Sequence, residues 1–241
     1  MFEPQRTELL RELDAAHAAY YEAAVFGGPS LHFHLRALAA AQAKDLASFS
    51  EAAYAMLASW GMHRMGRGGS KMREFDEFAA SLSAVWPLVI KLQDTLPHEL
   101  ANHHWDDLAA LFFGIKAMAT ATSLVGTSKV MAHALPKLVA PVDREYTLTL
   151  LFGNGQIRND KQAEWTTLRH ILEHFFYPVS ASPTFVAKAE AWMKESATFR
   201  WDTSPLKVVD NLLIGFQKRT SAEPHDEPAR GSALLRRRGL S

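Results

Sequence analysis

Lys129 and Asp143 are the two residues whose types and spacing most directly suggest chemistry in this chain of 241 residues. The sequence predicts that each lies at the start of a helix, and a short connector bounded by Pro136 and Pro141 joins the two helices. An amine and a carboxylate that face one cleft can bind a phosphate, act as a nucleophile or stabilise a developing positive charge. Lys129 and Asp143 are therefore the candidate catalytic residues.

The tetrapeptide Val125-Gly126-Thr127-Ser128 comes directly before Lys129 and predicts a glycine turn. Glycine adopts a positive φ without steric cost, so the amides of Thr127, Ser128 and Lys129 would point outward from a helix start. Such amides bind a phosphate group without regard to sequence. The alternative is an ordinary corner between two helices, with no ligand.

Asp143 stands in Val142-Asp143-Arg144-Glu145, which has the pattern of a helix start with Asp143 at the N-cap. A plain capping role, worth about 1 kcal/mol of stability, is the alternative to a catalytic one. The positive end of the helix dipole favours the ionised carboxylate. The sequence therefore predicts a fixed, charged aspartate that faces the connector.

VGTSKV followed by APVDREY resembles the hairpin of the helix-hairpin-helix DNA glycosylases. In that family a lysine follows the turn in the bifunctional members, and a V-P-V-D segment provides the catalytic aspartate. The resemblance implies that Asp143 stabilises an oxocarbenium-like transition state or orients water. It also implies that Lys129 either attacks the sugar or contacts a phosphate. The implied DNA contacts are Gly126, Thr127, Ser128 and Arg144.

The resemblance departs from the family pattern in two ways. The usual first glycine of the turn is absent, since Leu124 and Val125 occupy that region. Lys129 and Asp143 are also only fourteen positions apart, closer than in the well-known members, which favours the phosphate role for Lys129. Outside the hairpin, only Leu206–Phe216 resembles the family, as a closing core helix.

A second group of candidate residues lies between Trp60 and Arg73, where basic residues and glycines occur together without an acid. Glycines allow close approach of the backbone to a ligand, and aromatic and methionine side chains offer surface on which a base can stack. The sequence predicts that this segment contacts DNA and an extruded base. The alternative is a solvated loop with Trp60 in the core. The candidates are Trp60 and Met62 for the base, and His63, Arg64, Arg67 and Lys71 for DNA.

Eleven histidines raise the question of a metal site. His32 and His34, and the pair His103-His104, lack the spacing or the carboxylate partner of common metal motifs. His170 and His174 are four residues apart on one helix face, a spacing that can ligate a metal, but such a pair alone more often lies beside a core or on a surface. Nucleotide-binding loops, dinucleotide fingerprints and nucleophile elbows are also absent. We expect neither a metal nor a cofactor.

The composition is that of an ordinary globular chain, with 48% hydrophobic and 22% charged residues. There is no cysteine, which excludes disulfides and thiolate metal sites and fits a cytoplasmic protein. No apolar run is long enough to span a membrane, and the charged N-terminus does not have the pattern of a secretory signal. The net charge is zero, so binding to double-stranded DNA would need a local basic face.

Helical periodicity extends over almost the whole chain, and only 147–152 could be a strand. The predicted helices lie near 9–20, 46–62, 72–92, 105–118, 143–152, 161–176, 184–198 and 205–217. Residues 221–241 have the composition of a flexible tail. We therefore predict an all-α fold, a two-lobed helical bundle with a helix-hairpin-helix motif within residues 1–220.

These observations predict a monomeric DNA glycosylase that flips out a damaged or modified base and hydrolyses its N-glycosidic bond, in DNA repair or in defence against phage with modified DNA. A non-catalytic helix-hairpin-helix DNA-binding module and a helical protein–protein adaptor are the alternatives. The identity of the base cannot be read from the sequence, and lyase activity depends on the role of Lys129.

Overall fold

The computed structural model describes residues 1–23, 27–64, 71–119 and 122–222. Over these residues the chain is helical and has no β-sheet, which confirms the all-α prediction; Met72 and Met118 form one isolated bridge. The helices are α1 (Glu3–Arg11), α2 (Leu13–Ala23), α3 (Pro29–Gln42), α4 (Leu46–Ser59), α5 (Phe75–Leu92), α6 (Asn102–Gly114), α7 (Leu124–Ala134), α8 (Thr149–Phe152), α9 (Lys161–Ile171), α10 (Tyr177–Ser180), α11 (Pro183–Lys194) and α12 (Pro205–Ala222). The short helical segments are η1 (Met62–Arg64), η2 (Pro97–Glu99), η3 (Arg144–Leu148) and η4 (Leu172–Phe176).

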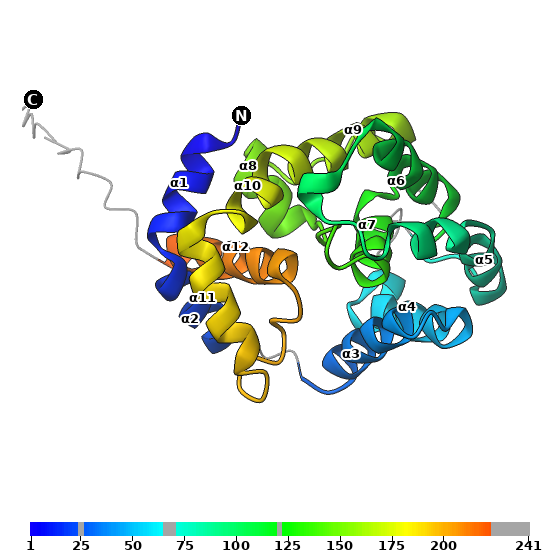
Figure 1. The fold of residues 1–241 in the computed structure, drawn as a ribbon, viewed down its shortest axis with the longest axis horizontal. Coiled ribbons are helices and arrows are strands. Elements are labelled where there is room, and N and C mark those ends of the chain that lie inside the picture. The colour runs from blue at the N-terminus through cyan, green and yellow to red at the C-terminus, as the bar shows by residue number, and fades with distance from the viewer. Residues whose placement is uncertain (24–26, 65–70, 120–121, 223–241) are drawn as a thin grey trace, which may run out of the picture.

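The helices form two neighbouring groups that share one hydrophobic core. In Figure 1, α1, α2, α11 and α12 lie on one side, and α3 to α7 lie on the other with α9 beside them. Most buried apolar side chains, from Leu9 of α1 to Phe216 of α12, belong to one cluster, and Tyr20, Leu31 and Trp201 form a second, smaller one. The two lobes and the helix-hairpin-helix motif remain predictions.

Within the first group, α2 and α12 pack unusually closely. At Gly215 of α12, a Cβ atom would lie 1.9 Å from the carbonyl oxygen of Ala16 in α2. Only glycine allows this approach, because a van der Waals contact needs about 3.5 Å. The contact fixes the two helices that form one wall of the cavity described below.

Most predicted helices agree with the structure, and the differences have local causes. The stripe from Leu9 to Tyr20 is split between α1 and α2 at Glu12. The run 147–152 is helical, so the alternative of a strand is wrong; its first two residues belong to η3, which Asp143 caps, and the others form α8. Residues 221 and 222 belong to α12, and the rest of the predicted tail lies outside the described residues.

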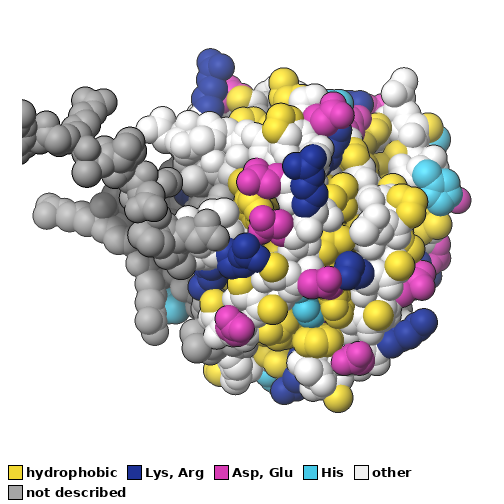
Figure 2. Space-filling view, turned by 90° about the vertical axis from the view of Figure 1, so that its left-hand side faces the viewer, with side chains coloured by type: hydrophobic (Ala, Val, Ile, Leu, Met, Phe, Trp, Pro, Cys, Tyr) yellow, Lys and Arg dark blue, Asp and Glu magenta, His cyan; other side chains and the backbone are white. Residues whose placement is uncertain are grey.

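The surface shows no large area of one charge on the face in Figure 2, where basic and acidic side chains alternate with apolar ones. This mixture fits a chain with 26 basic and 26 acidic residues. Among the described helices, none combines the length and the apolar character needed to cross a bilayer.

Candidate functional site

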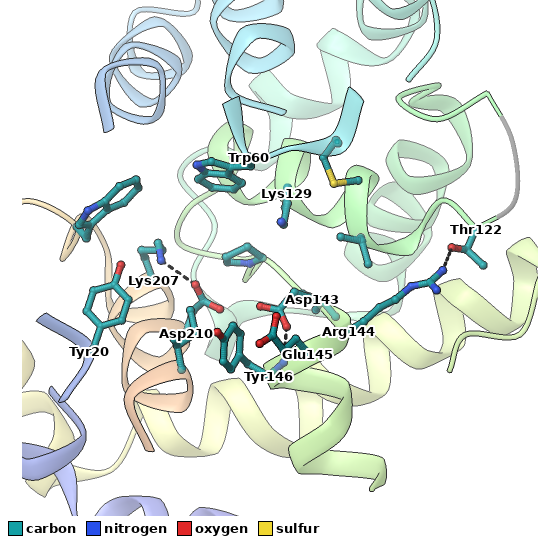
Figure 3. Close-up of a pocket in the computed structure, with 16 residues that line it drawn as sticks. Tyr20, Trp60, Thr122, Lys129, Asp143, Arg144, Glu145, Tyr146, Lys207 and Asp210 are labelled. Carbon is teal, nitrogen blue, oxygen red and sulfur yellow. Dashed lines mark hydrogen bonds and ion pairs between the residues drawn. The ribbon is translucent and has the colours of Figure 1, made fainter. Parts of the chain in front are cut away.

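A cavity of about 370 Å³ lies where α2 and α12 face the end of α4, the helix α7 and the segment η3 (Figure 3). Its size falls within the range of roughly 300–1,000 Å³ that is common for small-molecule sites. The lining residues are Tyr20, Trp60, Met62, Thr122, Val125, Lys129, Pro141, Val142, Asp143, Arg144, Glu145, Tyr146, Trp201, Lys207, Asp210 and Ile214. The structure thus brings five of the predicted site residues together: Trp60, Met62, Lys129, Asp143 and Arg144.

The predicted glycine turn before Lys129 is wrong, because Gly126 lies inside α7, which begins at Leu124. The φ of Gly126 is not positive, and the amide of Thr127 donates to the carbonyl of Ser123 within the helix. At the true helix start, the amides of Ser123 and Leu124 both donate to Glu164 Oε2 at 2.7 Å. An internal carboxylate therefore occupies the anion site at the true start of the helix, which lies before the amides of Thr127, Ser128 and Lys129 that we had expected to bind a phosphate.

Gly126, Thr127 and Ser128 are buried, so they are not placed to contact DNA. A Cβ atom on Gly126 would lie 2.7 Å from the sulfur of Met118, so the glycine makes room for that side chain. Ser128 joins α7 to the end of the connector, because its Oγ accepts from the amide of Val142 at 3.1 Å. This bond helps to hold Lys129 opposite Asp143.

Lys129 projects from the second turn of α7 into the cavity (Figure 3). Its Nζ lies 4.9 Å from the ring centroid of Trp60, a distance typical of a cation–π contact. Burial lowers the pKa of Lys129, and the carboxylates of Asp143 and Asp210 partly oppose that shift. A lysine with a lowered pKa holds more neutral amine near pH 7, which is the form that attacks a carbon.

Asp143 is the N-cap of η3, as the sequence predicted. Its Oδ1 accepts from the amides of Tyr146 at 2.7 Å and Thr147 at 3.2 Å, which fixes the carboxylate in the cavity. We expected the helix start to keep this group ionised, but the pKa of Asp143 is raised. Burial is the largest cause and the nearby Asp210 adds to it, whereas Lys129 and the two amide bonds act in the opposite direction.

Of the remaining predicted DNA contacts, Arg144 lines the cavity, His63 and Lys71 do not, and the side chains of the others lie beyond the described part of the chain. Arg144 is exposed, and its Nη2 donates to Thr122 Oγ1 at 2.8 Å. His63 and Lys71 are also exposed, and His63 Nδ1 is bonded to the carbonyl of Ala58. Arg67 and the side chain of Arg64 lie outside the part that the structure describes.

Tyr20 of α2 and the pair Lys207 and Asp210 of α12 line the opposite wall, and none of them belongs to the motifs that pointed to a site in the sequence. Lys207 Nζ and Asp210 Oδ2 are 2.7 Å apart, and both residues are buried. The i, i+3 spacing of a lysine and an aspartate inside an otherwise apolar helix was the available signal. The apolar residues around that pair predict only a core helix.

A buried histidine pair supports the backbone of Lys129 from behind. His133 Nδ1 lies 2.7 Å from the carbonyl oxygen of Lys129 and so must donate to it. His133 Nε2 then accepts from His34 Nδ1 at 2.7 Å, and His34 Nε2 accepts from Thr203 Oγ1 at 3.0 Å. All three of these hydrogen bonds have one donor and one acceptor when both histidine rings are neutral.

Among the described residues, no group of three or more histidine, aspartate or glutamate side chains has the geometry of a metal site. The pairs His32/His34 and His103/His104 thus have no metal-binding geometry around them in this part of the chain. No family model, curated protein or solved structure matches this chain. The candidate function therefore rests on the cavity and its side chains.

Proposed function

We propose that this chain is a DNA glycosylase that accepts one extruded nucleotide in the cavity and breaks the bond between base and sugar. The observation that supports this most is that Lys129 and Asp143 face one cavity from α7 and η3, although they lie fourteen residues apart. An amine and a fixed carboxylate beside one cavity are the groups that cleavage of an N-glycosidic bond needs.

The aromatic side chains of the cavity support the same proposal. Trp60 and Tyr146 offer flat faces, and an extruded base is commonly held by stacking between such groups. Extrusion costs a few kcal/mol and is least costly for a mismatched or damaged base. A cavity of about 370 Å³ has the size expected for one nucleoside-sized ligand.

In the proposed reaction, Asp143 acts in its ionised form and stabilises positive charge that develops on the sugar as the base leaves. The electrons of the broken bond leave with the base, which takes up a proton. When Lys129 is neutral, its amine forms a bond to C1′ in the same step, which would allow a Schiff base and strand cleavage to follow. When water attacks instead, the product is an abasic site.

The residues proposed to contact DNA differ from those that the sequence alone suggested. Gly126, Thr127 and Ser128 are excluded by burial, so the proposed contacts are Arg144 at the mouth and the basic residues between His63 and Lys71. The resemblance to helix-hairpin-helix glycosylases therefore supports the proposal through the Lys129–Asp143 pair and not through the turn.

A screen for released bases tests the proposal. Purified protein is incubated with duplexes that each contain one damaged, modified or mismatched base, and free bases are identified by mass spectrometry. We expect one class of base to be released, with alkali-labile sites left in the strand. DNA binding without release would indicate the non-catalytic module, and neither binding nor release would indicate the adaptor.

Asp143→Asn is the sharpest variant for this screen, because asparagine remains a good N-cap while the charge is lost. We expect base release to fall by roughly 10²-fold or more, with DNA affinity and melting temperature nearly unchanged. Asp45→Asn is the matched control, since Asp45 caps α4 by accepting from the amide of Ser48 and does not line the cavity. Wild-type turnover in Asp143→Asn would remove Asp143 from the mechanism.

A further inference from the structure

One wall of the cavity has polar groups that the proposed reaction does not use. Tyr20 comes from α2, and Lys207 and Asp210 come from α12, across the cavity from Lys129 and Asp143 (Figure 3). All three residues of this wall are buried, with at most 8% of their surface exposed. We call them the recognition wall.

Each member of the recognition wall has hydrogen-bonding capacity left for a ligand. Asp210 Oδ2 accepts from Lys207 Nζ at 2.7 Å, but no hydrogen bond from any described residue reaches its Oδ1. The ammonium of Lys207 also donates to Asn211 Oδ1, which leaves one of its three N–H groups. The hydroxyl of Tyr20 has no hydrogen-bond acceptor among the described residues, so its proton is available.

The recognition wall is held in place by a buried network behind it. Asn211 is fully buried, and its Nδ2 donates to Asp202 Oδ1 at 2.7 Å. Asp202 Oδ2 is in turn 2.7 Å from His17 Nε2, and the ring of His17 stacks on Trp192 with centroids 3.9 Å apart. A network of this kind fixes the direction in which Lys207 and Asp210 face the cavity.

Tyr20 stays a neutral donor in this setting. Burial raises the pKa of Tyr20, and the nearby carboxylates of Asp210 and Asp202 raise it further. The wall therefore offers two donors, the Tyr20 hydroxyl and Lys207 Nζ, and one acceptor, Asp210 Oδ1.

The count of donors and acceptors distinguishes the bases. The Watson–Crick edges of cytosine and of uracil or thymine each present two acceptors and one donor. Guanine presents one acceptor and two donors, and adenine presents one of each. Proteins that extrude a base commonly read this edge, and an unpaired buried polar group is costly.

We infer that the recognition wall binds the Watson–Crick edge of an extruded pyrimidine, so that the substrate is a pyrimidine-derived nucleotide and not a purine. Tyr20 and Lys207 donate to its two acceptors, and Asp210 accepts from its N–H or amino group. Trp60 and Trp201 provide aromatic surface beside the same cavity. This inference rests on the proposed function only in taking extruded nucleotides as the ligands.

The test separates recognition from catalysis by using nucleotides that resist cleavage. Four duplexes each contain one 2′-fluoroarabino nucleotide (cytosine, uracil, guanine or adenine) opposite a tetrahydrofuran abasic analogue, so that no base is paired. Affinity is measured by fluorescence anisotropy. We expect the two pyrimidine duplexes to bind about tenfold more tightly than the two purine duplexes, as one further satisfied hydrogen bond predicts.

Tyr20→Phe keeps the ring and removes only the hydroxyl, and it should reduce the pyrimidine preference to roughly threefold or less. Asp210→Asn should likewise reduce the pyrimidine preference to roughly threefold or less. Tyr54→Phe is the matched control, because the Tyr54 hydroxyl donates to the carbonyl oxygen of Arg73 and Tyr54 does not line the cavity. Thermal melting of each variant checks that it is folded. If Asp210→Asn does not fold, the pyrimidine preference of Tyr20→Phe alone tests the inference.

Equal or tighter binding of the purine duplexes, no binding of any duplex, or an unchanged preference in Tyr20→Phe would overturn the inference. The outcomes also separate it from the proposed function. Pyrimidine preference without base release would contradict only the glycosylase activity. Release of a purine base would support the activity and contradict the recognition wall.

Discussion

At the scale of single residues, the two candidate catalytic groups are both shifted toward their neutral forms. Burial lowers the pKa of Lys129 and raises that of Asp143, because a charge is less stable away from water. Their mutual attraction opposes both shifts without cancelling them. Within the proposed function, the lowered pKa of Lys129 fits a nucleophilic role, whereas the short spacing to Asp143 suggested a phosphate contact.

The lowered pKa of Lys129 leads to a direct prediction. Borohydride should trap the wild-type protein covalently on a DNA substrate, because a neutral amine forms a Schiff base that borohydride reduces. Trapping should increase as pH rises through the lowered pKa of Lys129, and Lys129→Ala should abolish it. Lys137→Ala is the control, since Lys137 is half exposed and does not line the cavity. The trapped species is counted on a denaturing gel.

The opposite result has an equally clear meaning. If neither wild type nor Lys129→Ala is trapped, and the variant binds DNA more weakly with a shallower salt dependence, Lys129 contacts a phosphate. Unchanged binding and activity in Lys129→Ala would exclude both roles.

At the scale of helices, the recognition wall depends on how closely α2 and α12 pack. A methyl group at Gly215 would lie 1.9 Å from the oxygen of Ala16 and 2.7 Å from the amide nitrogen of Tyr20. Because both neighbours are backbone atoms, the helices must move apart to make room. Such a movement would separate Tyr20 from Lys207 and Asp210.

We therefore expect Gly215→Ala to reduce the free energy of unfolding by about 2 kcal/mol or more, measured by urea denaturation. The pyrimidine preference should fall in the same variant. Gly27→Ala is the control, because a Cβ atom there meets nothing within 4 Å and its φ is not positive. Stability equal to that of the wild type would show that α2 and α12 can separate at little cost.

At the scale of the whole molecule, the buried histidine pair makes the fold sensitive to acid. Burial lowers the pKa of His133 to about 4. Burial also lowers the pKa of His34, and the nearby His133 adds to that shift. Below an unfolded pKa of about 6.5, the unfolded chain binds more protons than the folded protein does. The contribution of these two histidines to the free energy of unfolding is therefore fully present above about pH 6.5, and it is lost as the pH falls toward 4.

For His133 alone, the free energy of unfolding should fall by roughly 2 kcal/mol between pH 7 and pH 5, measured by urea denaturation. The raised pKa values of Asp143 and Glu164 act in the opposite direction, because these carboxyls bind protons more readily in the folded state. His133→Gln should flatten the pH dependence, since glutamine can donate and accept without titrating. His98→Gln, at an exposed position, should leave it unchanged.

The proposed DNA binding would also depend on the whole surface, since a chain with zero net charge must concentrate positive charge somewhere to bind DNA. We expect Arg64→Ala with Arg67→Ala to weaken DNA binding and to reduce the slope of log K against log salt by about 0.9 for each phosphate that the variant no longer neutralises. Lys188→Ala with Lys194→Ala removes the same charge from α11 and should have little effect. An unchanged slope in the arginine variant would place the basic face around Lys116, Lys137 and Arg144.

The sequence by itself determined the features that depend on neighbours within one helical turn. Periodicity predicted the all-α class and most helices, and the N-cap at Asp143 followed from its own position and the amides three and four residues later. Trp60, Met62 and Lys129 were also identified as site residues from local patterns, and all three line the cavity.

Tertiary structure alone decided the rest, because burial and distant partners are not visible in a local pattern. Gly126 lies inside a helix whose first amides donate to Glu164, about forty residues later in the chain. Lys207 and Asp210 meet Tyr20 only because α12 packs against α2. The pKa of Asp143 is raised and not lowered because the removal of water around a folded carboxylate outweighs the helix end that caps it.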